Sequence, residues 1–167
     1  MSSSRETILS LIRENQPQPV ARPELKFVKQ TFENPVKRFC ELVESVGGMT
    51  RIINANESFC EFTNIAANDK VLSTLKEIPE QNIDRNKIKS AHDMKDIDYC
   101  GFHTDLAVAE NGAFLTNCED FDFRSVYFLA QHLIVTVNAK DIKHNMHEAY
   151  NHVDVDDLGE FSVFISG

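Results

Sequence analysis

The stretch that decides the fold is DLAVAENGAFLTN, residues 105–117, in which a carboxylate and a glycine interrupt an apolar run. Its first half alternates leucine or valine with alanine, which predicts a strand with apolar side chains on both faces. Asn111 and Gly112 then permit positive φ and predict a turn. Glu110 is therefore expected at the carboxyl end of a buried strand, at the rim of a sheet.

Two interpretations of Glu110 are open at this point. An Asn-Gly pair after an alternating stretch is a hairpin signal, and an exposed glutamate at a strand end is ordinary. Alternatively, the carboxylate acts as a nucleophile, a base or a ligand holder beside a loop whose glycine lets a substrate come close. Ligands of open α/β sheets bind at the carboxyl ends of strands, which is where this residue is expected.

Outward from this stretch, predicted strands alternate with predicted helices. The strands are expected at 49–54, 70–73, 104–110, 113–116, 132–137 and 161–166. The helices are expected at 34–46, from Asn56, around 85–90, from Asp120 or Asp122 to Ala130, and from Asn138 or Asp141 to Tyr150. The segment 132–137 is apolar on both faces, as in a strand covered by helices on each side. The alternation predicts an α/β fold with a largely parallel sheet.

The sequence divides into three expected parts: a helical arm over 1–15, a proline-rich linker over 16–30 and an α/β domain over 31–167. Ser3 and Glu6 have the spacing of a capping box. The apolar residues that follow share one helical face: Ile8, Leu11 and Ile12. Such an arm would pack on the domain or on a partner.

Composition limits the classes of partner. The chain has 167 residues, with 17 Lys and Arg against 26 Asp and Glu, a formal charge of -9. Nucleic acid and anionic membranes are therefore poor partners. No apolar run is long enough for a membrane span and the start has no secretory signal, so a cytoplasmic location is expected.

The cysteines predict no metal or iron–sulfur site held by this chain alone. They contain no C-x-x-C pair and are widely separated, at Cys40, Cys60, Cys100 and Cys118. Reduced cysteines that pack as small apolar residues are expected. His144 and His147 are expected on the solvated side of the helix that ends at Tyr150, so no metal site is predicted there either.

Two further polar residues have two interpretations each. Arg124 could clamp a carboxylate or phosphate, or it could pair with Asp120 or Asp122. His132 opens a buried strand, where it could be a hydrogen-bonded structural histidine or a catalytic one.

Several segments together resemble one known family. TDLAVAENGAFLTN, Arg124, FLAQHLIVTVNAKDI and the terminal FSVFISG follow, in order and spacing, the LUD domain family of the lactate utilization protein C type. SSSRETILSLIREN resembles the opening helix of that family. The resemblance implies the fold of the ribose-phosphate isomerase, glucosamine-phosphate deaminase and CoA-transferase group, a three-layer sandwich with a mostly parallel sheet and helices on both faces.

The resemblance also implies a function. Bacterial family members of this type belong to a multi-subunit system that oxidises L-lactate to pyruvate, whose iron–sulfur clusters lie on sister proteins. The chain is then expected to be a cluster-free subunit without a cofactor of its own. Its expected partners are the iron–sulfur subunits, a small anionic metabolite and, as a further option, a second copy of itself.

By position, the family's polar turn maps onto Glu110, Asn111 and Gly112, its arginine onto Arg124 and its histidine onto His132. The chain departs from the family at Ala113, where threonine is common, and at Ala130-Gln131, where proline often precedes the histidine. Family members also continue past ISG into a further segment, so a ligand-contacting loop is expected to be missing.

A rival interpretation makes the chain an enzyme. AENG resembles the S-E-N-G turn of one class of CoA-transferases, whose glutamate attacks the acyl thioester. Glu110 would then be the nucleophile, and the Gly112 backbone N–H could help to stabilise an oxyanion.

Overall fold

The computed structural model describes residues 4–17, 20, 30–54, 57, 63–117, 121, 123–153 and 161–166. Its α-helices are α1 (Ser4–Glu14), α2 (Pro35–Ser45), α3 (Val126–Leu129) and α4 (Met146–Asn151). Its strands are β1 (Val71–Ser73), β2 (Tyr99–Thr104), β3 (Ala107–Val108), β4 (Ala113–Asn117), β5 (His132–Val137), β6 (Ile142–Lys143) and β7 (Ser162–Ile165). Three short 3₁₀ helices complete it: η2 (Arg85–Lys87), η3 (Ala91–Met94) and η4 (Ala139–Asp141).

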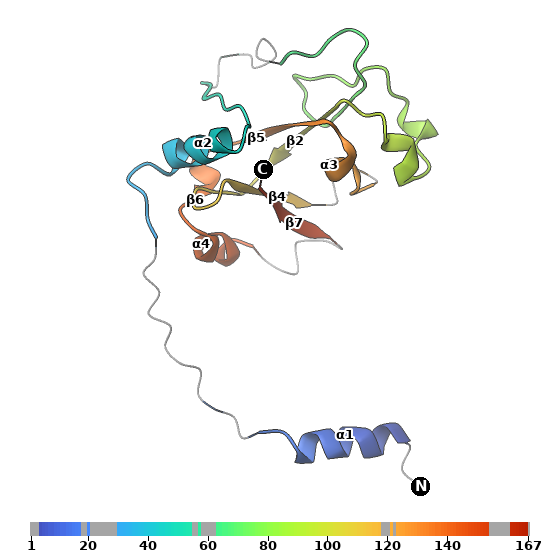
Figure 1. The fold of residues 1–167 in the computed structure, drawn as a ribbon, viewed down its shortest axis with the longest axis vertical. Helices are drawn as coiled ribbons and strands as arrows, with labels where there is room; N and C mark the ends of the chain where they lie inside the picture. The colour runs from blue at the N-terminus through green and yellow to red at the C-terminus, as the bar shows by residue number, and fades with distance from the viewer. Residues whose placement is uncertain are drawn as a thin grey trace.

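Three of the strands form a parallel sheet of order β1-β2-β5. β2 pairs with β5 along its whole length, from Tyr99 opposite His132 to Thr104 opposite Val137. β1 pairs with the first half of β2. This parallel sheet with its flanking helices confirms the predicted three-layer α/β fold (Figure 1).

The remaining strands form a mixed sheet of order β6-β3-β4-β7. β3 follows β2 and β6 follows β5, and this second pair of strands is again parallel. β4 is antiparallel to both β3 and β7. The Asn-Gly turn therefore closes a hairpin between β3 and β4, as the first interpretation of that stretch predicts.

Apolar side chains pack on both faces of the parallel sheet. Phe102 is fully buried on one face, where its ring meets those of Phe114, Phe121 and Tyr127. The other face is covered by apolar side chains of the loops on either side of β1: Ile65, Leu75 and Ile78. Because apolar side chains pack on both faces, the parallel sheet is held in place, and so are the loops that follow its strands.

The local signals for α2 are confirmed. Asn34 caps the helix, since its Oδ1 accepts a hydrogen bond of 2.9 Å from the Lys37 backbone N–H, and Pro35 is the first helical residue. Gly47 follows the helix with φ +95°, which glycine adopts without strain. The expected N-terminal helix is present over Ser4–Glu14 and has no buried residue.

Three predictions of local structure are wrong. Residues 49–54 form no strand, although they read as one. The predicted strand 104–110 is displaced, because Tyr99–Thr104 and Ala107–Val108 form two strands separated by a bend. The last helix begins at Met146, capped by Asn145 rather than by Asn138 or Asp141, because Ile142 pairs with Ala107 in β6.

Some predictions lie outside the described residues. These include the Ser3 cap, most of the linker 16–30, most of the helix expected from Asn56, and Cys60, Cys118, Asp120 and Asp122. Within the described ranges, none of the helices combines the length and apolar character that crossing a bilayer requires.

Candidate functional site

Glu110 is held inside the fold by helix α4. It lies half-buried in the turn between β3 and β4, and its Oε2 accepts a hydrogen bond of 2.9 Å from the backbone N–H of Met146. Met146 is the first residue of α4, so the carboxylate satisfies one of the N–H groups that a helix leaves unpaired at its start. A negative charge at this helix end is also favoured by the helix dipole.

Asn111 and Gly112 use their polar groups to build the turn itself. The Oδ1 of Asn111 accepts a hydrogen bond of 3.1 Å from the Ala113 backbone N–H. Gly112 has φ +69°, and its N–H donates to the carbonyl of Val108 at 3.0 Å. The Gly112 N–H, which an oxyanion would need, is therefore engaged within the hairpin.

The loop before α4 ties the segment that precedes α2 to the domain. His144 is half-buried, and its Nδ1 accepts a hydrogen bond of 3.0 Å from the Phe32 backbone N–H. Asn145 is buried and donates from Nδ2 to the Gln30 carbonyl at 2.8 Å. The expectation that His144 is a solvated helical residue is therefore wrong, because it precedes the helix and binds a distant backbone group.

His132 lies at the opposite end of the parallel strands. It is exposed, and its ring stacks on that of Tyr99, with 5.0 Å between the ring centroids. It opens β5, whereas Glu110 follows β3, beyond the carboxyl end of β2. A strand of this length spans about 17 Å at ~3.3 Å per residue. The structure therefore does not bring Glu110 and His132 together.

Arg124 is placed at a third position. Its guanidinium carbon lies 4.8 Å from the ring centroid of Phe161, a cation–π geometry. Phe161 precedes β7, whose first residue pairs with Asn117 at the end of β4 that is remote from Gly112. The ligand-binding roles of Arg124, His132 and the Glu110 turn stay predictions, but these residues do not line one common pocket.

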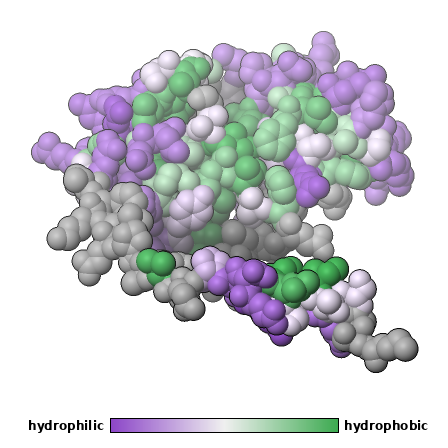
Figure 2. Space-filling view, turned by 60° about the horizontal axis from the view of Figure 1, so that its bottom comes forward, coloured by the Kyte–Doolittle hydropathy of each residue, from purple (hydrophilic) through white to green (hydrophobic). Residues whose placement is uncertain are grey.

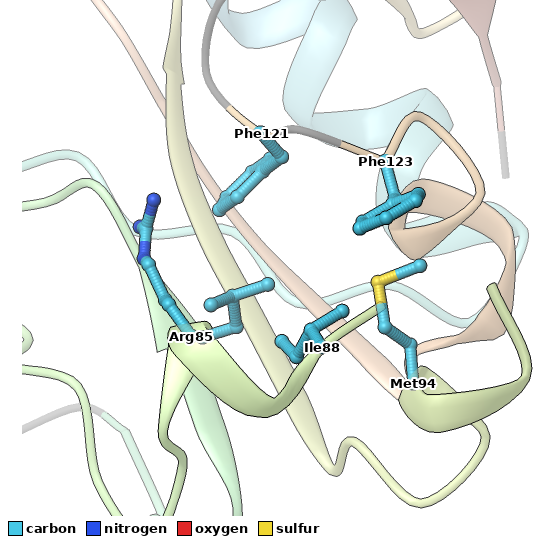
Figure 3. Close-up of a pocket in the computed structure, with 6 residues that line it drawn as sticks. Arg85, Ile88, Met94, Phe121 and Phe123 are labelled. Carbon is cyan, nitrogen blue, oxygen red and sulfur yellow. The ribbon is translucent and has the colours of Figure 1, made fainter. Parts of the chain in front are cut away.

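A hollow does open beside the parallel sheet, at a place that the sequence interpretation left unassigned. Its empty volume of about 250 Å³ is mostly space that is open to solvent, and the hollow itself has room for about one water molecule. Apolar side chains make up most of its wall. The lining residues are Leu72, Arg85, Ile88, Met94, Phe121 and Phe123. Figure 3 shows the two phenylalanines on one side, Ile88 and Met94 on the other, and the Arg85 guanidinium at one end.

Arg85 supplies the charge of this hollow. Its Nη2 donates to the carbonyl of Ser73, the last residue of β1, at 3.3 Å, and its Nε lies 2.5 Å from a Glu80 carboxylate oxygen. The guanidinium carbon is 5.7 Å from the ring centroid of Phe121. A guanidinium over an aromatic ring, at the carboxyl end of a parallel strand, can receive a small anion that has an apolar body.

Two carboxylates hold the loop that carries this wall. Asp84 caps η2 by accepting from the Asn86 backbone N–H at 3.1 Å, and this hydrogen bond lowers the pKa of Asp84 below its ordinary value. Asp93 accepts from the backbone N–H groups of Lys89 and Ser90 at the start of η3. The Lys89 N–H and then the Ser90 hydroxyl lower the pKa of Asp93 as well.

The sequence contains a signal for this loop. Ser90 and Asp93 have the S-x-x-D spacing of a capping box, which marks the start of a helical turn. Reading residues 74–98 only for apolar periodicity misses it, because the turns are single and 3₁₀. No such signal points to Phe121 and Phe123, which reach the hollow through tertiary packing alone.

Metal ligation has no candidate among the residues that the structure describes, where no group of three or more His, Cys, Asp or Glu side chains could hold an ion. Cys40 is half-buried and Cys100 is buried, and neither forms a disulfide within the described residues.

Comparison with known proteins shows the fold. No protein-family model and no curated protein match this chain. Among solved structures, it is similar to a DUF162 family protein from Deinococcus radiodurans, with a TM-score of 0.64 and 15% sequence identity. The likeness covers 79% of this chain and 86% of that one. DUF162 is a family that includes the LUD-domain proteins, so the shared fold agrees with the resemblance seen in the sequence.

Proposed function

We propose that this chain is a cluster-free accessory subunit of a system that oxidises L-lactate to pyruvate. It binds the iron–sulfur subunits of that system and performs no redox chemistry by itself. The sequence resemblance and the shared fold with a DUF162 protein support this role.

The observation that carries the proposal is the exposed apolar face of α1. Its large apolar side chains leave 38–54% of their surface exposed, and none of its residues is buried: Ile8, Leu9, Leu11 and Ile12. Figure 1 draws α1 apart from the α/β body, and Figure 2 shows these apolar side chains gathered along one face of the helix. An amphipathic helix of this kind gains stability when its apolar face is laid into a groove of another protein.

A second candidate, binding of a small anionic metabolite, is favoured by Arg85. Its guanidinium lies at one end of the apolar hollow, so it would bind a carboxylate while the aromatic wall contacts the rest of the ligand. Binding of the metabolite and docking of the partner use different parts of the chain and are compatible.

We do not propose the CoA-transferase-like alternative. The Gly112 N–H donates to the Val108 carbonyl, so it is not available to stabilise an oxyanion, and one oxygen of the Glu110 carboxylate accepts from the Met146 backbone.

Reconstitution tests the accessory role. The purified chain is combined with the iron–sulfur subunits of its host's lactate oxidation system, and L-lactate-dependent reduction of an artificial acceptor is measured. We expect turnover by the complex and none by the chain alone. Lactate oxidation by the isolated chain, or full activity of the iron–sulfur subunits without it, would contradict the proposal.

Paired variants of α1 test the docking face. Ile8→Ser together with Ile12→Ser removes apolar area from the exposed face and is expected to weaken binding to the iron–sulfur subunits at least tenfold, about 1.4 kcal/mol. Glu6→Gln with Arg13→Gln changes the opposite face of the same helix and should leave the affinity within twofold. Equal effects of the two pairs would show that the apolar face is not the contact.

A further inference from the structure

β5 is an edge strand with the composition of a central one. It pairs with β2 on one side, and within the described residues no strand pairs with its other side. Its sequence, HLIVTV, has no acid, lysine, arginine or proline. Exposed edge strands are usually blunted by charges, proline or bulges, because they can pair with another chain. β5 has none of these features.

The open side of β5 carries unpaired backbone groups. The His132 N–H donates to the Asp98 carbonyl, so His132, Ile134 and Thr136 direct their N–H and C=O groups toward β2. Alternate residues of a strand face opposite neighbours. Leu133, Val135 and Val137 therefore direct theirs outward, and the described part of the chain supplies these outward groups with no backbone partner. All three residues are half-exposed.

The local absence of Asp, Glu, Lys and Arg lets a second copy occupy this edge. The chain carries a formal charge of -9, so two copies repel each other over most of their surface. β5 is an uncharged stretch of six residues, where two copies can approach without placing carboxylates together. The exposed Phe128 and Leu129 belong to α3, which is separated from the start of β5 by two residues.

We infer that two copies of this chain pair through β5 in an antiparallel manner across a two-fold axis at Val135. This register sets the outward-facing residues opposite one another: Val135 faces its own copy, and Leu133 faces Val137 of the partner subunit. Antiparallel partners of this kind exchange both backbone hydrogen bonds, so the pairing supplies about six of them. The two parallel sheets then become one continuous sheet.

The side chains suit this register. Leu133 and Val135 lie on the face of β5 that packs on the Phe102 cluster, while Ile134 lies on the other face. In the dimer these side chains meet β-branched or leucine neighbours on the first face, and Ile134 meets the partner's Thr136 on the second. β-Branched and apolar cross-strand pairs are the ones that stabilise sheets.

Size-exclusion chromatography with light scattering tests the dimer on the full chain without any other protein. The wild type is expected at twice the mass of the chain. Val135→Pro removes an outward N–H that β2 does not use, so it should yield a folded monomer with an unchanged circular dichroism spectrum. A monomeric wild type at about 100 μM, or a dimer unaffected by this change, would overturn the inference.

Cysteine cross-linking tests the register without altering the backbone. Hydrogen-bonded antiparallel partners have Cα atoms about 5.5 Å apart, within the range that a disulfide spans. Val135→Cys alone should form a covalent dimer on oxidation. Leu133→Cys alone should not exceed the wild-type background, whereas Leu133→Cys with Val137→Cys should cross-link. The reverse pattern would exclude this two-fold axis even if the variant with proline failed to fold.

Two other occupants give different results. If α1 made the dimer contact, Ile8→Ser with Ile12→Ser would produce a monomer, and the inference would fail. If a strand of another protein normally covered β5, the isolated chain would be monomeric, which also contradicts it. Neither result depends on the lactate assay, so this inference and the proposed function can fail separately.

Discussion

Glu110 and Arg85 are both charged residues whose side chains lie near the carboxyl end of a strand, Glu110 after β3 and Arg85 against the Ser73 carbonyl of β1, yet the fold uses them differently. The Glu110 carboxylate is turned inward and accepts from the first backbone N–H of α4. The Arg85 side chain is 40% exposed, and its guanidinium pairs with Glu80 beside an apolar hollow. The residue in the clearer motif is thus bound by the backbone, while the residue in the least regular segment lies at the end of a shallow apolar hollow.

The difference shows what a turn motif can and cannot indicate. Glu110, Asn111 and Gly112 form a compact polar sequence because a hairpin and a helix start both need polar groups at that point. A motif that resembles a catalytic turn is therefore also a complete structural unit. Arg85 lies in no such turn motif, and its surroundings, Phe121 among them, are brought together by tertiary packing.

Glu110→Ala should have the largest effect on stability. It leaves the Met146 N–H without its acceptor and removes a negative charge from the start of α4, which should lower the free energy of unfolding by about 2 kcal/mol. Urea denaturation measures the change.

Two comparisons sharpen this prediction. Glu110→Gln keeps an oxygen acceptor and should cost less than half as much. Glu33→Ala removes an exposed glutamate to which the described part of the structure assigns no hydrogen bond, and it should be nearly neutral. If Glu110→Ala is as neutral as Glu33→Ala, the carboxylate does not anchor α4, and a ligand-binding role for it regains support.

Local signals in the sequence predict those elements that depend on local interactions. The start of α2 is marked by Asn34 and Pro35, and its end is marked by Gly47, which follows the helix. The segment 132–137, which carries apolar residues on both faces, predicts β5 to the residue. The positive φ of Gly112 and the hairpin follow from the Asn-Gly pair.

Elements that depend on distant partners could not be predicted in the same way. β2 contains Gly101 and His103, which interrupt any apolar pattern, and it is a strand because β1 and β5 pair with it on both sides. Gly101 is also close-packed, since a Cβ there would lie 2.8 Å from the Ser73 hydroxyl. The separation of His132 from Glu110 likewise depends on strand direction and bend, which composition does not encode.

Arg85→Met should have a smaller effect on stability than Glu110→Ala and a larger one on binding. The ion pair with Glu80 is partly exposed, so its loss should cost less than about 1 kcal/mol. If the hollow receives a small carboxylate, calorimetric titration with pyruvate or L-lactate should show binding that Arg85→Met weakens at least tenfold.

Lys87→Met is the matched control, because Lys87 lies on the same 3₁₀ turn but lines no part of the hollow. Binding of both metabolites should be unchanged in this variant. Absence of binding by the wild type, or an equal loss in both variants, would remove the hollow from the proposed function.

Asp93→Asn should have the smallest effect, and that effect should depend on pH. Hydrogen bonds from the Lys89 N–H and the Ser90 hydroxyl lower the pKa of Asp93 in the folded chain, so the fold stabilises its charged form. Such a group contributes its full stability above its unfolded pKa, about 4, and loses it as the pH falls through the lower folded value. The difference in urea midpoint between wild type and Asp93→Asn should therefore be constant from about pH 7 to 5 and shrink below 4. A difference that grows on acidification would mean that Asp93 is protonated in the fold. Its carboxylate would then not cap η3, the turn that carries Met94 to the wall of the hollow.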